Sequence, residues 1–152
     1  MRILALDVGD KRIGVAISDA TCTIAQPLTT LKKAKSSKKT QKDDNFLSEV
    51  AEIIKKYEVK EVIVGLPYNL DGSLSKKARE ILEFKDRLEA KSDVDIKTYD
   101  ERYSSKIAES LMIDQDVSRK KRKTRIDRLA AQIILQDYLN YKNNSPQQGE
   151  NL

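Results

Sequence analysis

Three acidic positions in this chain could carry out chemistry. Asp7 closes the apolar run Ile3-Leu4-Ala5-Leu6, a second acidic position follows the strand-like residues 94–99, and Asp127 opens a helical segment. A buried charge without a partner is strongly disfavoured, so carboxylates at the mouth of a buried sheet need a neutralising group. A divalent metal ion is the usual one. The pattern therefore predicts a metal-dependent nuclease.

Asp7 alternates along its strand with Ile3 and Ala5, so it belongs to an otherwise apolar face. It stands at the carboxyl end of the first strand, where open sheets tend to carry ligand sites. The structural alternative is that Asp7, which is followed by Val8 and Gly9, is an ordinary turn residue.

Asp127 shares a helix face with Ala131 and Ile134, which places it along the predicted buried stripe. In the structural alternative, residues 124–127 form a capping box in which Asp127 only satisfies free amide groups. At the remaining position the pattern cannot choose between Asp100 and Glu101, because adjacent strand residues face opposite sides of a sheet.

Taken together, converging carboxylates would suit phosphodiester hydrolysis. Two or three of them at one end of a sheet can hold Mg²⁺ or Mn²⁺ ions about 4 Å apart, and such a pair activates water and stabilises the leaving oxygen. The chain has no histidine and one cysteine, Cys22, which excludes a Cys/His zinc site, an intrachain disulfide and histidine acid-base catalysis. Carboxylate chemistry needs none of these.

Seven positive charges fall within residues 119–128, next to Asp127. We expect residues 119–123 to form a basic loop that holds a phosphate backbone by charge, without reading bases. Lys11 and Arg12, close to Asp7, could extend the same rim. The structural alternative is an ordinary solvated face.

The composition agrees with a nucleic-acid partner. Of the 152 residues, 35% are charged, and the net charge is +5, which favours polyanions. No apolar run approaches a membrane span, and a charge follows too early for a secretory signal, so a cytoplasmic location is expected.

The elements that must position these groups alternate in type. An antiparallel meander followed by helix-strand units predicts a mixed five-stranded sheet with parallel strands in its second half, within one domain of residues 1–142. Along the second strand, small residues at positions 14, 16 and 18 leave one face thin enough for close approach. The expected strands are residues 2–8, 13–18, 21–31, 59–65 and 94–99. The expected helices are residues 46–57, 74–88 and 126–141. We expect a loop at residues 32–44 and a disordered polar tail at residues 143–152.

The segment Gly65-Leu66-Pro67 followed by Asp71-Gly72 reads as the turn into the next helix. A glycine and proline loop after a central strand could also approach a nucleic-acid backbone. The role of the lysine-rich residues 32–42 stays open.

Four motifs in order resemble the YqgF or RuvX-like proteins, described as Holliday-junction resolvases and as nucleases that process the 5′ end of precursor 16S ribosomal RNA. The resemblance covers most of the chain. The motifs are Asp7-Val8-Gly9-Asp10-Lys11-Arg12-Ile13-Gly14-Val15-Ala16-Ile17-Ser18-Asp19, Gly65-Leu66-Pro67-Tyr68-Asn69-Leu70-Asp71-Gly72, Asp100-Glu101-Arg102 with Ser104-Ser105, and Ile126-Asp127 running into Ala130-Ala131-Gln132-Ile133-Ile134-Leu135-Gln136.

The resemblance implies a ribonuclease H-like fold, with Asp7, Glu101 and Asp127 as the catalytic residues that bind Mg²⁺ or Mn²⁺. It favours Glu101 over Asp100, which the strand pattern left open. Ser104 and Ser105 stand where relatives often carry threonine. The nucleic-acid-binding residues expected from charge and from these motifs are Lys11, Arg12, Arg102, Lys121, Arg122, Lys123 and Arg125.

Three other functions compete with rRNA processing. Branched DNA presents a similar phosphate geometry, so junction resolution is one alternative, although the expected monomer or weak homodimer agrees better with RNA processing. A basic RNA-binding or ribosome-binding module with idle carboxylates is another. An actin-like or sugar-kinase phosphotransferase is disfavoured, because 152 residues leave room for one domain and no second phosphate-binding turn is present.

Overall fold

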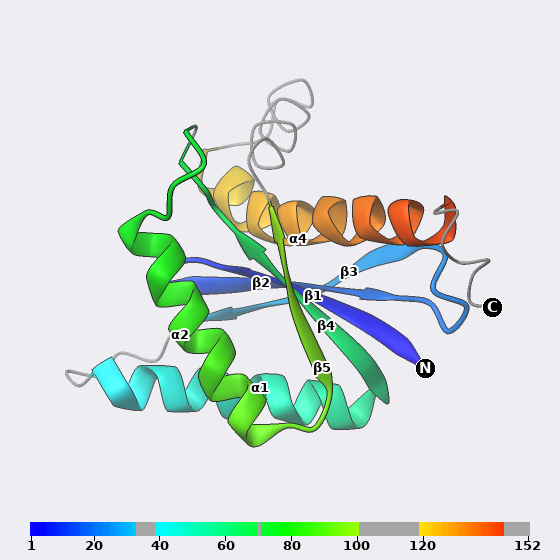
Figure 1. Cartoon of the computed structure of the whole chain (residues 1–152), viewed down its shortest axis with the longest axis horizontal. Coiled ribbons are helices and arrows are strands. Elements are labelled where there is room, and N and C mark those ends of the chain that lie inside the picture. Colours follow the sequence, from blue (N-terminus) through cyan, green and yellow to red (C-terminus); the bar gives the residue numbers. More distant parts are fainter. Residues whose placement is uncertain (33–38, 70, 101–118, 145–152) are drawn as a thin grey trace.

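A computed structural model describes residues 1–32, 39–69, 71–100 and 119–144 (Figure 1). Side chains are described in these ranges except at 39–44 and 119–128.

Five strands form one sheet in the order β3-β2-β1-β4-β5. Strand β1 is antiparallel to β2, and β2 is antiparallel to β3, whereas β4 pairs in parallel with both β1 and β5. The predicted mixed sheet is therefore confirmed, and the carboxyl ends of β1, β4 and β5 lie at one edge. The strands are β1 (Arg2–Val8), β2 (Arg12–Ser18), β3 (Ala25–Lys32), β4 (Val59–Leu66) and β5 (Asp95–Asp100).

Helices cover both faces of the sheet. Helices α1 (Lys39–Lys56) and α2 (Lys76–Lys91) lie on one face, and α4 (Arg119–Asn144) lies on the other (Figure 1). Two apolar clusters result, because alternate residues of each strand point to opposite faces. The central strand β1 contributes to both, which is why its apolar run is nearly continuous.

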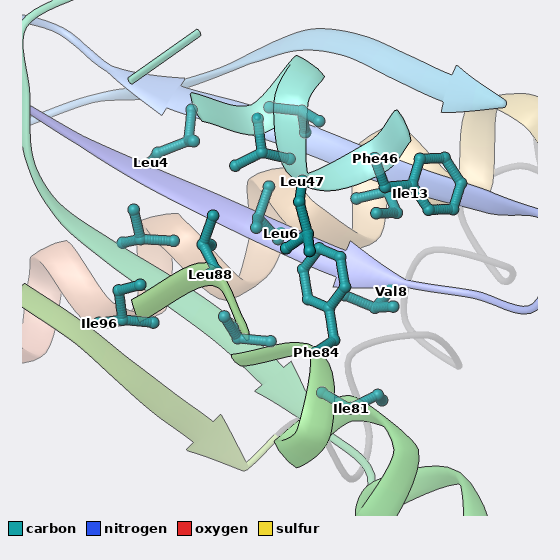
Figure 2. Packing of buried hydrophobic residues seen from close by; sticks show 14 of the residues in the cluster. Leu4, Leu6, Val8, Ile13, Phe46, Leu47, Ile81, Phe84, Leu88 and Ile96 are labelled. Carbon is teal, nitrogen blue, oxygen red and sulfur yellow. The ribbon is translucent and has the colours of Figure 1, made fainter. Parts of the chain in front are cut away.

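The larger cluster joins the sheet to α1 and α2. Figure 2 shows Phe46 and Leu47 of α1 beside the strand residues, with Phe84 and Leu88 of α2 completing the layer. All four are almost fully buried, and burying each such side chain contributes about 1.5–3 kcal/mol. Ser75 caps α2 by accepting a hydrogen bond from the backbone N–H of Ala78.

The smaller cluster joins the sheet to α4. Ala16 and Ala25 meet Ala131 of the helix, so small residues let the helix approach the sheet closely, as the thin face of the second strand predicted. Gln136 accepts a hydrogen bond from the N–H of Ala25 and donates one to the carbonyl of Thr23. These bonds fasten the second half of α4 over the beginning of β3.

The end of α4 lies over the beginning of β4. Lys142 Nζ lies 3.4 Å from Glu61 Oε1, and Asn143 donates to the carbonyl of Cys22. Strands β1 and β4 are parallel, so their beginnings lie at the same edge of the sheet. Since α4 ends over this amino edge, it runs from the carboxyl edge of these strands toward their amino edge (Figure 1).

Two predicted loops are wrong in part. Residues 39–44, expected as a loop, form the first turns of α1, and residues 119–123, the expected basic loop, begin α4. Lys, Arg and Gln are good helix formers, and like-charge repulsion along a helix costs only tenths of a kcal/mol. A helix anchored by its apolar half can therefore extend through a polar or basic segment.

The closing helix is also longer than the expected residues 126–141. Helix α4 has 26 residues and includes Asn143 and Asn144, which had been assigned to the tail. The remainder of the predicted tail lies outside the described residues. None of the helices described here combines the length and the apolar composition needed to cross a membrane.

Candidate active site

Asp7 lies at the carboxyl end of the central strand, on the face that α4 covers. Its face follows from the alternation with Ile3 and Ala5, which both pack in the α4 cluster. Asp7 is half-buried, whereas the residues before it in β1 from position 3 are fully buried. Asp7 therefore lies at the boundary between the buried core and the exposed carboxyl edge of the sheet.

Glycines flank Asp7 in both neighbouring strands. Gly14 of β2 pairs directly with Asp7. On the other side Leu6 pairs with Val64, so the next residue of β4, Gly65, is the neighbour of Asp7. Neither of the two paired positions therefore contributes a side chain next to Asp7, and glycine within a strand is typical of close approach by backbone or ligand.

The row of paired residues that contains Asp7 continues to the outer strands of the sheet. Gly14 pairs with Thr30 of β3, and Gly65 pairs with Tyr99 of β5. Residues that pair across a sheet share a face, and Tyr99 indeed packs against the α4 cluster. We refer to these five residues as the Asp7 row: Thr30, Gly14, Asp7, Gly65 and Tyr99.

Asp100 points away from this row. It pairs with Leu66, whose side chain belongs to the cluster under α1 and α2. The strand pattern had left Asp100 and Glu101 as alternatives, and the structure places Asp100 on the face opposite Asp7. Glu101 lies outside the described residues, as does Arg102.

Position 127 belongs to the helical backbone of α4, and its side chain lies outside the described part of the chain. It precedes Ala131 by four residues and Ile134 by seven, and both of these are fully buried against the sheet. Helical spacing therefore puts position 127 on the sheet-facing stripe, toward the end of α4 that begins near the carboxyl edge of β4 and β5 (Figure 1).

The turn between β1 and β2 forms one side of the site. The N–H of Gly9 donates to the carbonyl of Arg12 over 2.7 Å, and a Cβ at position 9 would lie only 2.9 Å from that oxygen. Lys11 at the turn is exposed and Arg12 is half-buried. Lys77 of α2 pairs with Asp10 over 2.6 Å, which ties the turn to the second helix.

The segment after β4 is a closed turn. The N–H of Asn69 donates to the carbonyl of Ser73, and the N–H of Gly72 donates to the carbonyl of Asn69. Ser73 donates to Asp71 through both its backbone N–H and its hydroxyl, which holds the pKa of Asp71 below its usual value. Gly72 has a φ of +88°, which favours glycine. These bonds confirm the predicted turn.

A second acidic residue on the α4 face lies at the opposite edge. Glu61 is 4% exposed, at the beginning of β4. Its oxygens lie 2.9 Å from Lys97 Nζ and 3.4 Å from Lys142 Nζ. Burial would raise the pKa of Glu61, but hydrogen bonds from Lys97 and Tyr138 and the charge of Lys142 outweigh it and lower the pKa.

The described residues bring together only part of the predicted site. Asp7, Lys11 and Arg12 lie at one corner of the sheet, whereas the side chains of Asp127, Lys121, Arg122, Lys123 and Arg125 lie outside the description, together with Glu101 and Arg102. Within the described ranges, no three acidic or cysteine side chains form a metal-binding group.

Sequence reasoning missed Gly65, Thr30 and Tyr99 as neighbours of Asp7. The signal for Gly65 was available, because a glycine within a β-branched strand often marks close approach. Thr30 and Tyr99 gave no such signal, since their place in the row depends on strand order and register.

Sequence comparison gives consistent relatives. The family model described as RuvX, Holliday junction resolvase, matches residues 1–141. A Halothermothrix orenii protein named "Putative pre-16S rRNA nuclease" is 49% identical over 143 residues, which cover 94% of this chain and 97% of that protein. A Caldanaerobacter subterraneus protein of the same name is 44% identical over 146 residues, covering 95% and 100%.

Comparison of structures supports the fold. Thermus thermophilus RuvC in complex with a Holliday junction has a TM-score of 0.64 and 14% identity, covering 95% of this chain and 98% of that one. The fowlpox virus Holliday junction resolvase has a TM-score of 0.53 and 17% identity, covering 92% and 99%. The expected ribonuclease H-like fold is thereby confirmed. With a family model matching nearly the whole chain and relatives above 40% identity, this chain belongs to the RuvX family.

Proposed function

We propose that this protein is a divalent-metal-dependent endonuclease that hydrolyses phosphodiester bonds in processing the 5′ end of precursor 16S rRNA in the cytoplasm. The observation that carries the proposal is the place of Asp7, flanked by glycines at the carboxyl edge of the central strand. The family match and the names of the relatives supply the reaction class and the substrate.

The residues proposed to hold Mg²⁺ or Mn²⁺ are Asp7, Glu101 and Asp127. Asp7 fits this role, because a carboxylate is the ligand type that these ions prefer and Asp7 ends the central strand, with glycine as its paired neighbour in β2. When bound, such ions activate water and stabilise the charge that develops on the phosphate. Glu101 directly follows β5 in the chain, and position 127 lies on the sheet-facing stripe of α4.

The basic residues are proposed to hold the phosphate backbone. Lys11 is exposed in the turn that follows Asp7, Arg12 begins β2, and Arg102 follows Glu101 in the chain. The remaining residues of the proposed set, Lys121, Arg122, Lys123 and Arg125, belong to the first turns of α4. Contacts of this kind position a substrate without reading its sequence, so the cleavage site is set by the shape of the nucleic acid.

Cleavage of branched DNA is the second candidate, favoured by the description of the matching family as a Holliday junction resolvase. Symmetric cutting of a four-way junction needs two active sites related by a two-fold axis. A monomer or weak homodimer, which we propose, agrees better with RNA. A non-catalytic RNA-binding or ribosome-binding role is the third candidate.

The decisive experiment compares wild type with Asp7→Asn on two substrates, an end-labelled precursor 16S rRNA fragment and a synthetic four-way DNA junction. Each is incubated with Mg²⁺, Mn²⁺ or chelator. We expect metal-dependent cutting of the RNA that Asp7→Asn abolishes while nucleic-acid affinity persists.

Each other result has a defined meaning. Cutting of the junction alone would select the resolvase. Binding without cutting in every reaction would select the non-catalytic role. Cutting that persists in a rigorously purified Asp7→Asn sample would remove Asp7 from the mechanism.

Charge reversal tests the basic set separately. Replacing Lys121, Arg122 and Lys123 together by Glu should weaken nucleic-acid binding and flatten its dependence on salt, because each lost phosphate contact reduces counterion release. Fluorescence anisotropy measures the affinity, and chelator prevents cleavage during the measurement. A salt range of about 50–200 mM is wide enough to give the slope of log affinity against log salt. An unchanged salt slope would contradict the assignment.

A further inference from the structure

A groove lies between the outermost strand β3 and helix α1, on the face of the sheet opposite the Asp7 row. It has a volume of about 360 Å³. Leu28 and Leu31 of β3 and Ile53 and Tyr57 of α1 form its apolar wall. These four side chains pack against the larger apolar cluster but are only half-buried. The groove therefore presents apolar surface that the described part of the chain does not cover.

The outer edge of β3 is a second feature of this region. Strand β3 is the outermost strand of the sheet, and within the described ranges no strand pairs with its outer side. The first half of this edge is irregular, because Pro27 has no backbone N–H and Leu28 has no partner in β2. Proline and bulges of this kind protect an edge from pairing. Residues 29–32 follow β2 in regular register, so their outward backbone groups can pair with an added strand.

Two acidic side chains line the same groove. Glu49 and Glu52 lie about one turn apart on α1, and within the described part of the chain neither has an ion-pair partner. Lys56 also lines the groove, and its Nζ lies 5.4 Å from the ring centre of Tyr57, in the range of a cation–π contact. The groove thus carries two carboxylates and one ammonium group, in a protein whose net charge is +5. Unpaired acids beside apolar surface favour a partner that carries both apolar and basic side chains.

We propose that this groove binds an extended basic segment of a partner protein, which pairs with residues 29–32 of β3 as an added strand. Apolar side chains of the segment contact Leu31 and Ile53. Its Lys or Arg residues pair with Glu49 and Glu52. Strand addition of this kind takes its affinity from main-chain hydrogen bonds and its specificity from pockets for alternate side chains. The inference goes beyond the proposed function and does not depend on it, since the groove and Asp7 lie on opposite faces of the sheet.

A peptide fits this site better than a second copy of the chain does. Edge pairing between two copies would use β3 twice, and Pro27 and the bulge at Leu28 limit the length of strand that both copies could offer. On the groove side β3 carries Thr29 and Leu31, which are uncharged. A second copy of β3 therefore supplies no cation for the acidic pair.

The test uses a synthetic peptide that stands in for the partner segment. The probe is fluorescein-labelled Thr-Lys-Thr-Val-Thr-Val-Thr-Lys-Thr, which as a strand turns both valines and both lysines to one face. One control peptide has Glu in place of both lysines, and another has Ser in place of both valines. Anisotropy with the full chain gives the affinity, and hydrogen exchange of residues 25–32 reports pairing with β3.

Charge reversal on α1 tests the site. The variant Glu49→Lys with Glu52→Lys reverses both carboxylates of the groove. The matched control is Glu80→Lys with Glu83→Lys, which has the same spacing and the same change of net charge on α2. The Tm of each variant shows whether it is folded. A difference between the two variants therefore reports the groove and not the charge of the protein as a whole.

We expect the probe to bind wild type and to slow hydrogen exchange in β3. The Glu49→Lys, Glu52→Lys variant should bind it at least about tenfold more weakly, because two attractive pairs become repulsive. The peptide with Glu in place of Lys should show the reverse preference and bind this variant better than it binds wild type. The peptide with Ser in place of Val should bind wild type at least about tenfold more weakly than the probe, because apolar burial is lost. The Glu80→Lys, Glu83→Lys variant should bind the probe within about twofold of wild type.

Four results would overturn the inference. Three of them are no binding of the probe, equal binding to wild type and to the Glu49→Lys, Glu52→Lys variant, and binding without slower exchange in β3. The fourth is self-association of wild type in analytical ultracentrifugation that this variant loses and that excess probe does not displace. That result would assign the groove to a second copy of the chain.

Cleavage assays keep this inference separate from the proposed function. Asp7→Asn should bind the probe as wild type does, and the Glu49→Lys, Glu52→Lys variant should cut the precursor rRNA fragment as the Glu80→Lys, Glu83→Lys control does. If no protein cuts but the probe binds as expected, the inference stands and the nuclease falls. If Asp7→Asn abolishes cutting and the probe does not bind, the nuclease stands and the inference falls.

Discussion

The α4 face of the sheet carries an acidic residue near each of its two edges, and the two are held in different ways. Glu61, near the amino edge, is almost fully buried and paired with Lys97 and Lys142. Asp7, at the carboxyl edge, is half-buried between two glycines. The first carboxylate is enclosed by long cationic side chains, and the second is flanked by positions that have no side chain.

This difference separates a structural carboxylate from a candidate functional one. Glu61 connects β4, β5 and α4, because its partners come from the other two elements. A buried acid with its own cations supports the fold and leaves little room for a ligand. An acid beside glycines at the carboxyl end of a strand contributes less to packing and stands where open sheets tend to carry ligand sites.

The largest effect is expected at Asp7. Asp7→Asn should reduce kcat by at least about a thousandfold, as expected for a group that acts directly on the reacting centre, while Tm changes little because Asn has nearly the same shape. Single-turnover cleavage and thermal unfolding of the same preparation measure both. If Asp7→Asn also lowered Tm strongly, Asp7 would support the fold as Glu61 does, and the contrast between the two carboxylates would be wrong.

The converse change is Glu61→Gln, which should destabilise the fold and spare the chemistry. Removing the charge takes the Glu61 carboxylate away from Lys97 and Lys142, although Lys97 keeps Asp95 at 3.7 Å, and we expect a loss of about 2 kcal/mol in the free energy of unfolding. This is below the range for fully buried pairs, because these lysine side chains are 48% and 40% exposed. Urea unfolding measures the loss. A kcat that falls with Glu61→Gln at a temperature where the variant is folded would contradict a purely structural role.

The pH dependence of stability should come from the Glu61 cluster. Burial and the hydrogen bond to Glu61 raise the pKa of Tyr138 to about 12. Because the folded protein holds this proton more tightly than the unfolded chain, the contribution is complete below pH 10.0 and is lost as the pH rises toward about 12. The pKa of Glu61 is lowered from 4.5, so its contribution is present above that pH and is lost as the pH falls through the lower folded value.

Urea unfolding of wild type and Glu61→Gln at pH 7 and at alkaline pH tests this assignment. The alkaline loss should be smaller in Glu61→Gln. Tyr138→Phe is the control for a second source of the alkaline loss. The pKa of Tyr99 is raised as well, so Tyr99 would still contribute to the loss of stability at alkaline pH when Tyr138 is replaced. An alkaline loss that is identical in all three proteins would place its origin outside the cluster.

The smallest effect is expected for Lys77→Ala. The ion pair with Asp10 joins α2 to the turn beside Asp7, but Asp10 is 82% exposed. Exposed pairs contribute about 0–1 kcal/mol, so we expect at most about 0.5 kcal/mol in unfolding and less than a twofold change in cleavage. A tenfold loss of kcat would show that the turn, and not only Asp7, must be held in place.

Much of this architecture was predictable because local signals agreed. The alternation around Asp7, the β-branched run of β4 and the helical spacing of Phe46 and Leu47 each predicted the element that forms. The errors lie in two polar segments, of which residues 119–123 are strongly basic. Residues 39–44 and 119–123 have no apolar periodicity, and they are helical because helices anchored elsewhere extend through them.

The sequence by itself determined the reaction class, the basic character and the carboxylate at position 7, because these depend on residue types and local pattern. Only the tertiary structure decided which residues surround that carboxylate. Gly14, Thr30 and Gly65 are distant along the chain and meet Asp7 through strand order and register. These are non-local pairings, and a register shift of one residue would turn a strand's side chains to the other face of the sheet.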